Sequence, residues 1–378
     1  MSLRVLHLFS NAKWTGPAEP ALNLCVALRG LGVDADFACA PDAGDSVNKV
    51  VETARDRGVE PILDFHLKKH RNPVYNWLDL RALTAYLGRE RYDLLHCHLD
   101  NDHRIAAAVA RRVGVQVVRS SYYGEGFPDK PGLAALAALA DRIIEPSERA
   151  LRHDVAAHGL DPTRLRVIPN AVDTDRFDPH RETPDGRRWL NVPHDAFVVG
   201  IVARMQTHRH FDDFFAAMRR LADAHPQAYV IVVGRGTHQE KVALEPVRRL
   251  GLRDRVRFSG YVDGENYVGM LRAFDVKAFL VPGSDGTCRA VREAMAMAKP
   301  IVTADRGMLA EIVDDGVNGF VCDGSGDGLF AALDRFARDR RLTREMGRAA
   351  REKALAEFAL PVQARRVLDV YEAALGRG

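Results

Sequence analysis

The chain has 378 residues, and its 54 Lys and Arg against 51 Asp and Glu give a formal net charge of +3. This length predicts two or three domains, and the 47% hydrophobic and 28% charged residues exclude an intrinsically disordered chain. The small, evenly mixed charge excludes a typical nucleic-acid-binding protein, and no apolar run approaches the 18 residues of a membrane-spanning helix. The five scattered cysteines favour reduced thiols in a cytoplasm over a disulfide framework or a zinc site.

Short apolar runs alternate with amphipathic helical stretches along the first half of the chain, a pattern typical of a parallel α/β sheet. One of the helices is expected at 101–113, where Gly114 ends it. Strands are predicted at 4–9, 35–39, 60–65, 93–97, 116–120, 142–145 and 165–168.

The rhythm breaks at 169–193, which holds several prolines and the charged run DRFDPHRETPDGRR, and we interpret 173–192 as an interdomain linker. A second series of strands is then predicted at 197–203, 229–233, 256–259, 276–280, 300–303 and 320–322. The fold class is therefore α/β, with two doubly wound domains in tandem at 1–172 and 193–359. Because such sheets bind ligands at the carboxyl ends of their strands, two facing sheets place the expected site in a cleft between them.

Three loops that follow predicted strands carry residues suited to phosphate. Gly16 lies at a strand-to-helix turn, where backbone N–H groups can approach an anion. Arg204 and Arg209 follow the first strand of the second domain and could clamp a diphosphate. Gly234 lies in a tight turn, Gly-Arg-Gly, that lacks the third glycine of a dinucleotide fingerprint, which argues against a nicotinamide dehydrogenase. The alternative for the glycines is that the backbone conformation of the turn requires them, and the alternative for the two arginines is that they are solvated loop residues.

The densest group of chemistry-bearing residues is the run PGSDGTCRAVREAMA at 282–296. Gly286 and Thr287 are predicted to open a helix whose free N–H groups can receive a phosphate or sugar oxygen. Asp285 precedes that helix and Glu293 follows eight residues later, so the two carboxylates are about 12 Å apart, the scale of a nucleotide sugar from hexose to ribose. The alternatives are a helix cap for Asp285 and a solvated or salt-bridged Glu293.

This pattern resembles that of glycosyltransferase family 4, the retaining group 1 glycosyltransferases of the GT-B fold, over nearly the whole chain. The family signature is an acidic residue, seven residues and a Glu, in a stretch like EGFG…EAMA-GKPVV; here it runs from Asp285 to Glu293 and continues as AMAMAKPIV. IPNAVD at 168–173 is similar to the family's IPNGVD, and HCH at 96–98 is similar to its VHxH.

The resemblance implies two Rossmann-like domains that face a central cleft, with a C-terminal helix at 360–378 crossing back to the first domain. It implies transfer of a hexose-type sugar from a nucleotide diphosphate donor, with retention and without a metal or other cofactor. The donor would lie mainly on the second domain. The catalytic residues that it implies are Asp285, Glu293, Arg204 and Arg209. The donor-binding residues that it implies are Gly16, Gly234, Tyr261, Val262, Gly286, Thr287, Cys288, Arg289 and Glu293.

Two positions near the expected reacting sugar are candidates for a sugar or acceptor contact. His98 is one, by resemblance to the family's histidine motif. Tyr123 is the other, because Tyr-Tyr-Gly at 122–124 stands where family members often have a histidine. A metal site formed by His96, His98 and Asp100 lacks further ligands at suitable spacing.

The expected partners are the donor and a sugar, lipid-linked or small-molecule acceptor, and an Arg at 289 resembles family members that build bacterial surface polysaccharides. The basic run HLKKHR at 66–71 suggests either a contact with anionic lipid or a phosphorylated acceptor, or a solvated loop. The protein is accordingly expected in the cytoplasm, either free or peripheral at the inner membrane surface, and no motif indicates an oligomeric state. Two other functions stay open: a nucleotide-sugar epimerase and a non-catalytic, nucleotide-sugar-binding partner subunit of the same fold.

Overall fold

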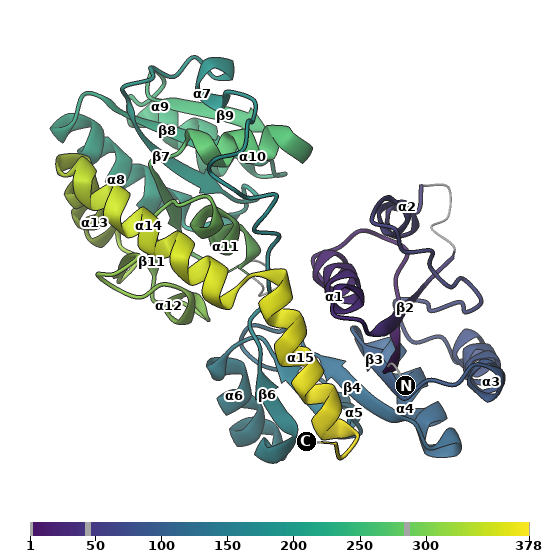
Figure 1. Cartoon of the computed structure of the whole chain (residues 1–378). Coiled ribbons are helices and arrows are strands. Elements are labelled where there is room, and N and C mark those ends of the chain that lie inside the picture. Colours follow the sequence, from purple (N-terminus) through teal and green to yellow (C-terminus); the bar gives the residue numbers. More distant parts are fainter. Residues whose placement is uncertain (1–2, 42–46, 283–287, 378) are drawn as a thin grey trace. The chain divides into compact units, whose positions relative to one another are not determined.

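A computed structural model describes residues 3–41, 47–282 and 288–377 of the chain (Figure 1). The contacts divide these residues into two compact units. The N-terminal unit comprises the residues up to Ala171 together with those from Leu360 onward, and the C-terminal unit comprises the residues from Val172 to Ala359.

The N-terminal unit contains a six-stranded parallel sheet with the strand order β2-β1-β3-β4-β5-β6. Its strands are apolar runs buried on both faces, as expected when helices cover a parallel sheet on both sides. The strands are β1 (Arg4–Phe9), β2 (Asp34–Cys39), β3 (Leu94–Cys97), β4 (Gln116–Ser120), β5 (Arg142–Glu145) and β6 (Leu165–Val167).

The strand predicted at 60–65 is wrong. Only Ile62 pairs with the sheet edge: its N–H donates to the Phe37 carbonyl at 2.9 Å, and its carbonyl accepts from the Cys39 N–H at 3.2 Å. The bridge between Ala38 and Ile62 is isolated, so the ladder does not extend to the residues on either side.

The helices of this unit begin and end close to the expected signals. The helix predicted at 101–113 is α4, and Gly114 ends it in the left-handed region with φ of 75°. The terminal helix α15 packs on α1, as expected, and its Tyr371 is fully buried in the core of the N-terminal unit. The helices are α1 (Ala18–Gly30), α2 (Lys49–Asp56), α3 (Pro73–Arg89), α4 (Asp100–Val113), α5 (Leu133–Ala137), α6 (Glu148–His158), the 3-10 turn η1 (Pro162–Arg164) and α15 (Leu360–Ala374).

The C-terminal unit contains a second six-stranded parallel sheet, ordered β12-β11-β10-β7-β8-β9. Each strand overlaps one of the six predicted ranges, so the fold class of two doubly wound parallel sheets is confirmed. The strands are β7 (Phe197–Val202), β8 (Ala228–Val233), β9 (Val256–Gly260), β10 (Val276–Phe279), β11 (Ile301–Ala304) and β12 (Gly319–Cys322).

Helices cover this second sheet, and the apolar residues of α8 from Phe211 to Leu221 are buried against it. The segment 173–192 packs within the same unit, since Phe177 and Val192 belong to its core. No helix in the described part of the chain is long and apolar enough to span a bilayer. The helices and turns are α7 (Gly186–Trp189), η2 (Thr207–Arg209), α8 (Phe211–Ala224), the π-helical turn η3 (Glu240–Leu244), α9 (Glu245–Arg249), α10 (Gly264–Ala273), α11 (Arg289–Ala296), α12 (Leu309–Ile312), α13 (Gly326–Arg338) and α14 (Arg340–Glu357).

Charged side chains are among the buried residues of this unit. Lys277 of β10 is fully buried, and its Nζ has no hydrogen-bond partner among the described residues. The ammonium lies 6.0 Å from the Phe274 ring centroid and 5.6 Å from that of Phe279. Burial lowers the pKa of Lys277 to about 7, while the Glu293 carboxylate acts in the opposite direction.

Replacing this lysine by a flexible apolar side chain is expected to stabilise the C-terminal unit. Lys277→Met removes an unpartnered buried polar group, which should raise the free energy of unfolding by about 1–3 kcal/mol near pH 7. The unfolded lysine keeps its proton up to its ordinary pKa, so the wild-type protein gains stability as pH rises from about 7. The advantage of the methionine variant should therefore shrink between pH 7 and 9.

Denaturant titrations at both pH values measure this difference. Lys299→Met is the matched control, because the Lys299 Nζ donates to the Arg272 carbonyl at 3.0 Å and its removal should not stabilise the protein. A Lys277→Met protein that is less stable than wild type at pH 7 would contradict the account.

Candidate donor site in the C-terminal unit

The order of strands in the C-terminal sheet fixes where a ligand can approach it. The chain runs outward from β7 through β8 to β9, then returns to the other side of β7 with β10 and continues to β12. The loops that leave β7 and β10 therefore turn in opposite directions, and this topology predicts a ligand crevice at the carboxyl ends of these two strands. The predicted arginines and the signature helix follow these two strands in sequence.

Arg204 and Arg209 occupy the loop after β7, but in different surroundings. Arg204 is exposed and has no hydrogen-bond or ion-pair partner among the described residues. Arg209 ends the short turn η2 and is 8% exposed. Its Nη1 donates to the carbonyls of Val281 and Pro282 at 3.0 and 2.9 Å. Arg209 thus binds the loop after β7 to the end of β10, and Arg204 is the solvent-facing cation beside it.

The ends of β8 and β9 come close to the same loop through a glycine. Gly234 has φ of 128°, and a Cβ there would lie 2.4 Å from the Ala203 carbonyl oxygen, so a larger residue does not fit. Its N–H donates to the Gly260 carbonyl at 2.9 Å, which joins the turns after β8 and β9. Tyr261 follows directly, is 65% exposed and lies under the Arg235 guanidinium at 5.4 Å. Its neighbour Val262 packs partly on the core.

The signature helix α11 begins in an unusual backbone conformation. Cys288, at its N-cap, has φ of 47° although it is not a glycine, and its side chain is 2% exposed. Left-handed backbone costs a residue with a Cβ about 1–2 kcal/mol, so the packing of this side chain holds the strained turn in place. Cys288, which the resemblance gives as a donor-binding residue, thus has a buried side chain. The predicted residues Asp285, Gly286 and Thr287 lie outside the described residues.

Glu293, two turns into α11, has a carboxylate fixed at both oxygens. The Tyr267 hydroxyl of α10 donates to Oε2 at 2.5 Å, and the Arg289 Nε lies 3.1 Å from Oε1. The Glu293 side chain is 5% exposed, whereas that of Arg289 is 41% exposed. Burial, and then the Glu293 carboxylate, raise the pKa of Tyr267 well above its usual range, so the phenol stays a neutral donor. A carboxylate held in this way keeps further lone pairs for hydroxyl groups.

Sequence reasoning missed Tyr267 and Lys277, the two groups that fix the electrostatics around Glu293. The sequence could have indicated Lys277, since a lysine within the apolar run VKAFL is unusual for a buried strand. For Tyr267 the sequence contains no such indication, because it lies 26 residues before Glu293 and only the fold brings the two side chains together.

In the N-terminal unit, the strand order reverses between β1 and β3, so the topology predicts the corresponding ligand crevice there. Asp102 of α4 joins the two loops, since its carboxylate accepts from the Ser10 N–H at 2.8 Å and the Leu99 N–H at 2.9 Å. Burial raises the pKa of Asp102 to about 7. Gly16 lies in the turn directly before α1, half-buried, at this same end of β1.

Tyr123 follows β4 at the carboxyl end of the same sheet. Its hydroxyl donates to Asp100 Oδ2 at 3.0 Å, and the buried Arg119 donates to Oδ1 at 2.9 Å. Burial, and then Asp100, raise the pKa of Tyr123 to about 12. Tyr123 is half-buried, which leaves part of the side chain open at this edge.

His98 lies in a different place from the one expected of a ligand contact. It is fully buried, and its Nε2 and Nδ1 share hydrogen bonds with His7 at 3.0 Å and with the Tyr122 hydroxyl at 2.7 Å. Neither nitrogen is left for a sugar or an acceptor. The resemblance to the family's histidine motif predicted a ligand contact for His98, but the structure places its side chain in an internal hydrogen-bond network.

Among the residues that the structure describes, two groups of side chains have the composition of a metal site. His7, His96 and His98 form one, although their ring centroids lie 4.5–5.2 Å apart and their planes are inclined by only 13–28°. Nearly parallel stacked rings direct their in-plane lone pairs side by side, which does not suit a shared ion. The second group is His153, Asp154 and His158 on α6. Its atoms are engaged in holding a loop, since Asp154 Oδ1 accepts from the Phe127 N–H and the His158 Nε2 bonds to the carbonyl of the same residue, both at 2.8 Å.

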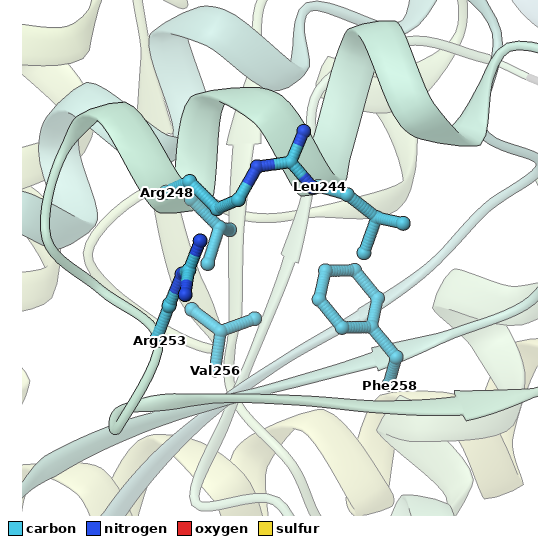
Figure 2. A pocket seen from close by; sticks show the side chains of 6 residues that line it. Leu244, Arg248, Arg253, Val256 and Phe258 are labelled. Atoms are coloured by element: carbon cyan, nitrogen blue, oxygen red, sulfur yellow. The ribbon is translucent and has the colours of Figure 1, made fainter.

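A hollow of about 320 Å³ lies elsewhere in the C-terminal unit, between β9 and the helical segment η3–α9 (Figure 2). Val256 and Phe258 of β9 form its floor, and Arg248 and Arg253 border it. Arg253 precedes β9, so the hollow extends toward the amino end of the strand, away from the edge that carries Arg204. None of the predicted site residues lines it.

Comparisons with known proteins agree with the resemblance. Residues 15–176 match the family Glycosyltransferase Family 4, and residues 183–353 match Glycosyl transferases group 1. The D-inositol 3-phosphate glycosyltransferase of Streptomyces avermitilis is 29% identical over 75% of this chain and 66% of its own length. The protein of the same name from Thermobifida fusca is 30% identical over 71% of this chain and 67% of its own.

Solved structures share the fold over nearly the whole chain. A glycosyltransferase from Rickettsia africae has a TM-score of 0.84 at 16% identity, with full coverage of both chains. Anabaena HepE, solved in complex with UDP, has a TM-score of 0.80 at 20% identity and covers 98% of this chain and 100% of its own. The strand order, the loops at the carboxyl ends and these matches lead to one conclusion: the chain belongs to glycosyltransferase family 4 and is a glycosyltransferase of group 1.

Proposed function

We propose that this glycosyltransferase moves a hexose-type sugar from a uridine diphosphate donor to a hydroxyl group of its acceptor, with retention at the anomeric carbon. The donor class is supported by Anabaena HepE, a protein of the same fold whose structures hold UDP and UDP-glucose. The relatives named for D-inositol 3-phosphate favour a phosphorylated polyol as the first acceptor to test. Sugars and lipid-linked saccharides are the further acceptor classes.

The observation that carries the proposal is the fixed Glu293 carboxylate. Tyr267 and Arg289 hold its two oxygens at 2.5 and 3.1 Å, on the helix that follows β10. A carboxylate with a fixed orientation suits a vicinal diol, because each oxygen can accept a further O–H bond. We assign it to the ribose hydroxyls of the donor.

The diphosphate is assigned to the loop after β7. Arg204 is exposed and free to form a bidentate contact, and Arg209 is held at the end of β10 by two carbonyls. Together with the amino end of α11, these cations would neutralise the charge that grows on the diphosphate as its bond to the sugar breaks. They would thus supply the stabilisation that a divalent ion gives elsewhere.

The reaction then needs few further groups. The bond between the anomeric carbon and the diphosphate oxygen breaks, and the acceptor oxygen forms its new bond on the same face. The acceptor proton passes to the departing phosphate, so no separate general base is required. Tyr123 and the segment 285–287 are our candidates for contacts to the acceptor and the hexose.

A transfer assay tests this reaction directly. UDP-glucose and other UDP-hexoses are incubated with D-inositol 3-phosphate and other acceptors in excess EDTA, and proton NMR reads the anomeric configuration of the product. The proposal predicts transfer that survives EDTA and retains the donor configuration. An inverted product, or loss of transfer in EDTA, would contradict it. Donor conversion without acceptor would identify an epimerase instead, and tight donor binding without transfer or hydrolysis would identify a non-catalytic binder.

The assignment of the diphosphate has its own test. Arg204→Ala should weaken UDP binding by about 1.5–3 kcal/mol, because it removes hydrogen bonds to a charged group. Since Arg204 has no partner among the described residues, the thermal unfolding midpoint without ligand should stay unchanged. Isothermal titration and thermal unfolding measure the two quantities. Arg253→Ala, at the hollow beside β9, is the control; weaker UDP binding in this variant alone would place the nucleotide in the hollow.

A further inference from the structure

Helix α3 of the N-terminal unit exposes several large apolar side chains on its first two turns. Val74, Trp77 and Leu78 are 66%, 55% and 36% exposed, and their spacing of three and four residues places them on one face. Tyr75 beside them is 36% exposed. An exposed Trp with two aliphatic neighbours on one helix face is a contiguous patch, which in folded proteins marks an interaction site.

The opposite face of the same helix packs against the N-terminal unit. Asp79, Leu83 and Leu87 recur at four-residue intervals and are buried, and the helix packs on α4. Asp79 accepts hydrogen bonds from the N–H groups of His66 and Leu67 at 2.7 and 2.9 Å, which fixes the preceding loop to the helix. The outer patch is therefore not a weakly packed part of the core.

Basic side chains surround the patch. Lys69 and Arg71 are exposed in the loop just before the helix, and Arg81 continues the apolar face with its guanidinium 4.9 Å from the Trp77 ring centroid. Lys68 lies 5.3 Å from the Tyr75 ring centroid. Asp79, which is buried, is the only acidic residue between 65 and 89. The surface is thus apolar at its centre and positive at its border.

We propose that this surface, the α3 face formed by Lys69, Arg71, Val74, Trp77, Leu78 and Arg81, binds the surface of an anionic lipid bilayer. Trp and aliphatic side chains insert at the boundary between headgroups and acyl chains, and Lys and Arg bind the lipid phosphates. The helix lies in the plane of the interface, because its buried inner face must stay on the protein. This inference is independent of the reaction proposed above.

Charge decides between a bilayer and a second copy of the chain. In a symmetric dimer through the α3 face, the basic border of one copy would meet the basic border of the other. No exposed carboxylate on the face could compensate that repulsion. Anionic lipid supplies the missing charge and the apolar phase together.

Vesicle sedimentation of the full chain tests the proposal. Binding is expected with phosphatidylcholine vesicles that contain phosphatidylglycerol, less binding in high salt, and none with phosphatidylcholine alone. Lys69→Glu with Arg71→Glu should lower the affinity at least ~20-fold, since each basic residue near an anionic surface contributes about fivefold. Arg344→Glu with Arg348→Glu, two exposed residues of α14, is the charge-matched control and should bind nearly as wild type.

The apolar centre is tested separately. Trp77→Ser should lower vesicle binding at least ~10-fold through loss of buried apolar area, whereas Trp189→Ser, at a tryptophan that is 49% exposed in the C-terminal unit, should not. With Trp14 and Trp189 changed to Phe, Trp77 is the only tryptophan left, and its fluorescence should be quenched by brominated lipid.

Equal binding by the face variants and their controls, or no quenching of Trp77, would overturn the proposal. So would a concentration-dependent dimer that Trp77→Ser abolishes in the absence of vesicles, since a second copy would then occupy the face. Light scattering of the wild-type protein without lipid measures this outcome. All the substituted side chains are exposed or half-buried, so circular dichroism should confirm that every variant folds.

Discussion

The reversal of strand order between β7 and β10 is the constraint on which the C-terminal half of the account depends. It turns neighbouring loops away from each other and leaves the carboxyl ends of two parallel strands open. Arg209 stabilises that opening, because its guanidinium bridges the loop after β7 to the carbonyls that end β10. The residues that we assign to the donor, Arg204 and Glu293, belong to the elements that follow these two strands.

In the N-terminal unit, a carboxylate instead of a guanidinium joins the two loops where the strand order reverses. There the order reverses between β1 and β3, and the Asp102 carboxylate, rather than a guanidinium, joins the two loops through backbone N–H groups. His7, His96 and His98 are buried near these loops. Burial lowers the pKa of His7 to about 3, so its imidazole is uncharged at neutral pH. The buried Arg119 guanidinium lies beside this layer, near the carboxylates of Asp100 and Asp102, whereas Arg204 at the C-terminal edge is exposed.

The fold could be predicted from the sequence because buried parallel strands are continuous apolar runs, and twelve of the thirteen predicted runs overlap strands. The exception, 60–65, pairs with the sheet only at Ile62, and the run contains Pro61, a residue that is disfavoured in strand interiors. For the candidate site, the sequence could place residues that follow directly after a strand, such as Arg204 and Gly234, and their role in donor binding stays a prediction. Tyr267 and the burial of His98 depend on contacts between helices and strands distant in sequence, which local patterns do not contain.

The central claim concerns where a nucleoside diphosphate binds, and a crystal structure of the protein with UDP tests it most directly. The account predicts diphosphate oxygens within hydrogen-bond distance of the guanidinium groups of Arg204 and Arg209, with the ribose hydroxyls on Glu293. A diphosphate bound elsewhere, as in the hollow bordered by Arg248 and Arg253, with Arg204 still turned to solvent, would contradict it.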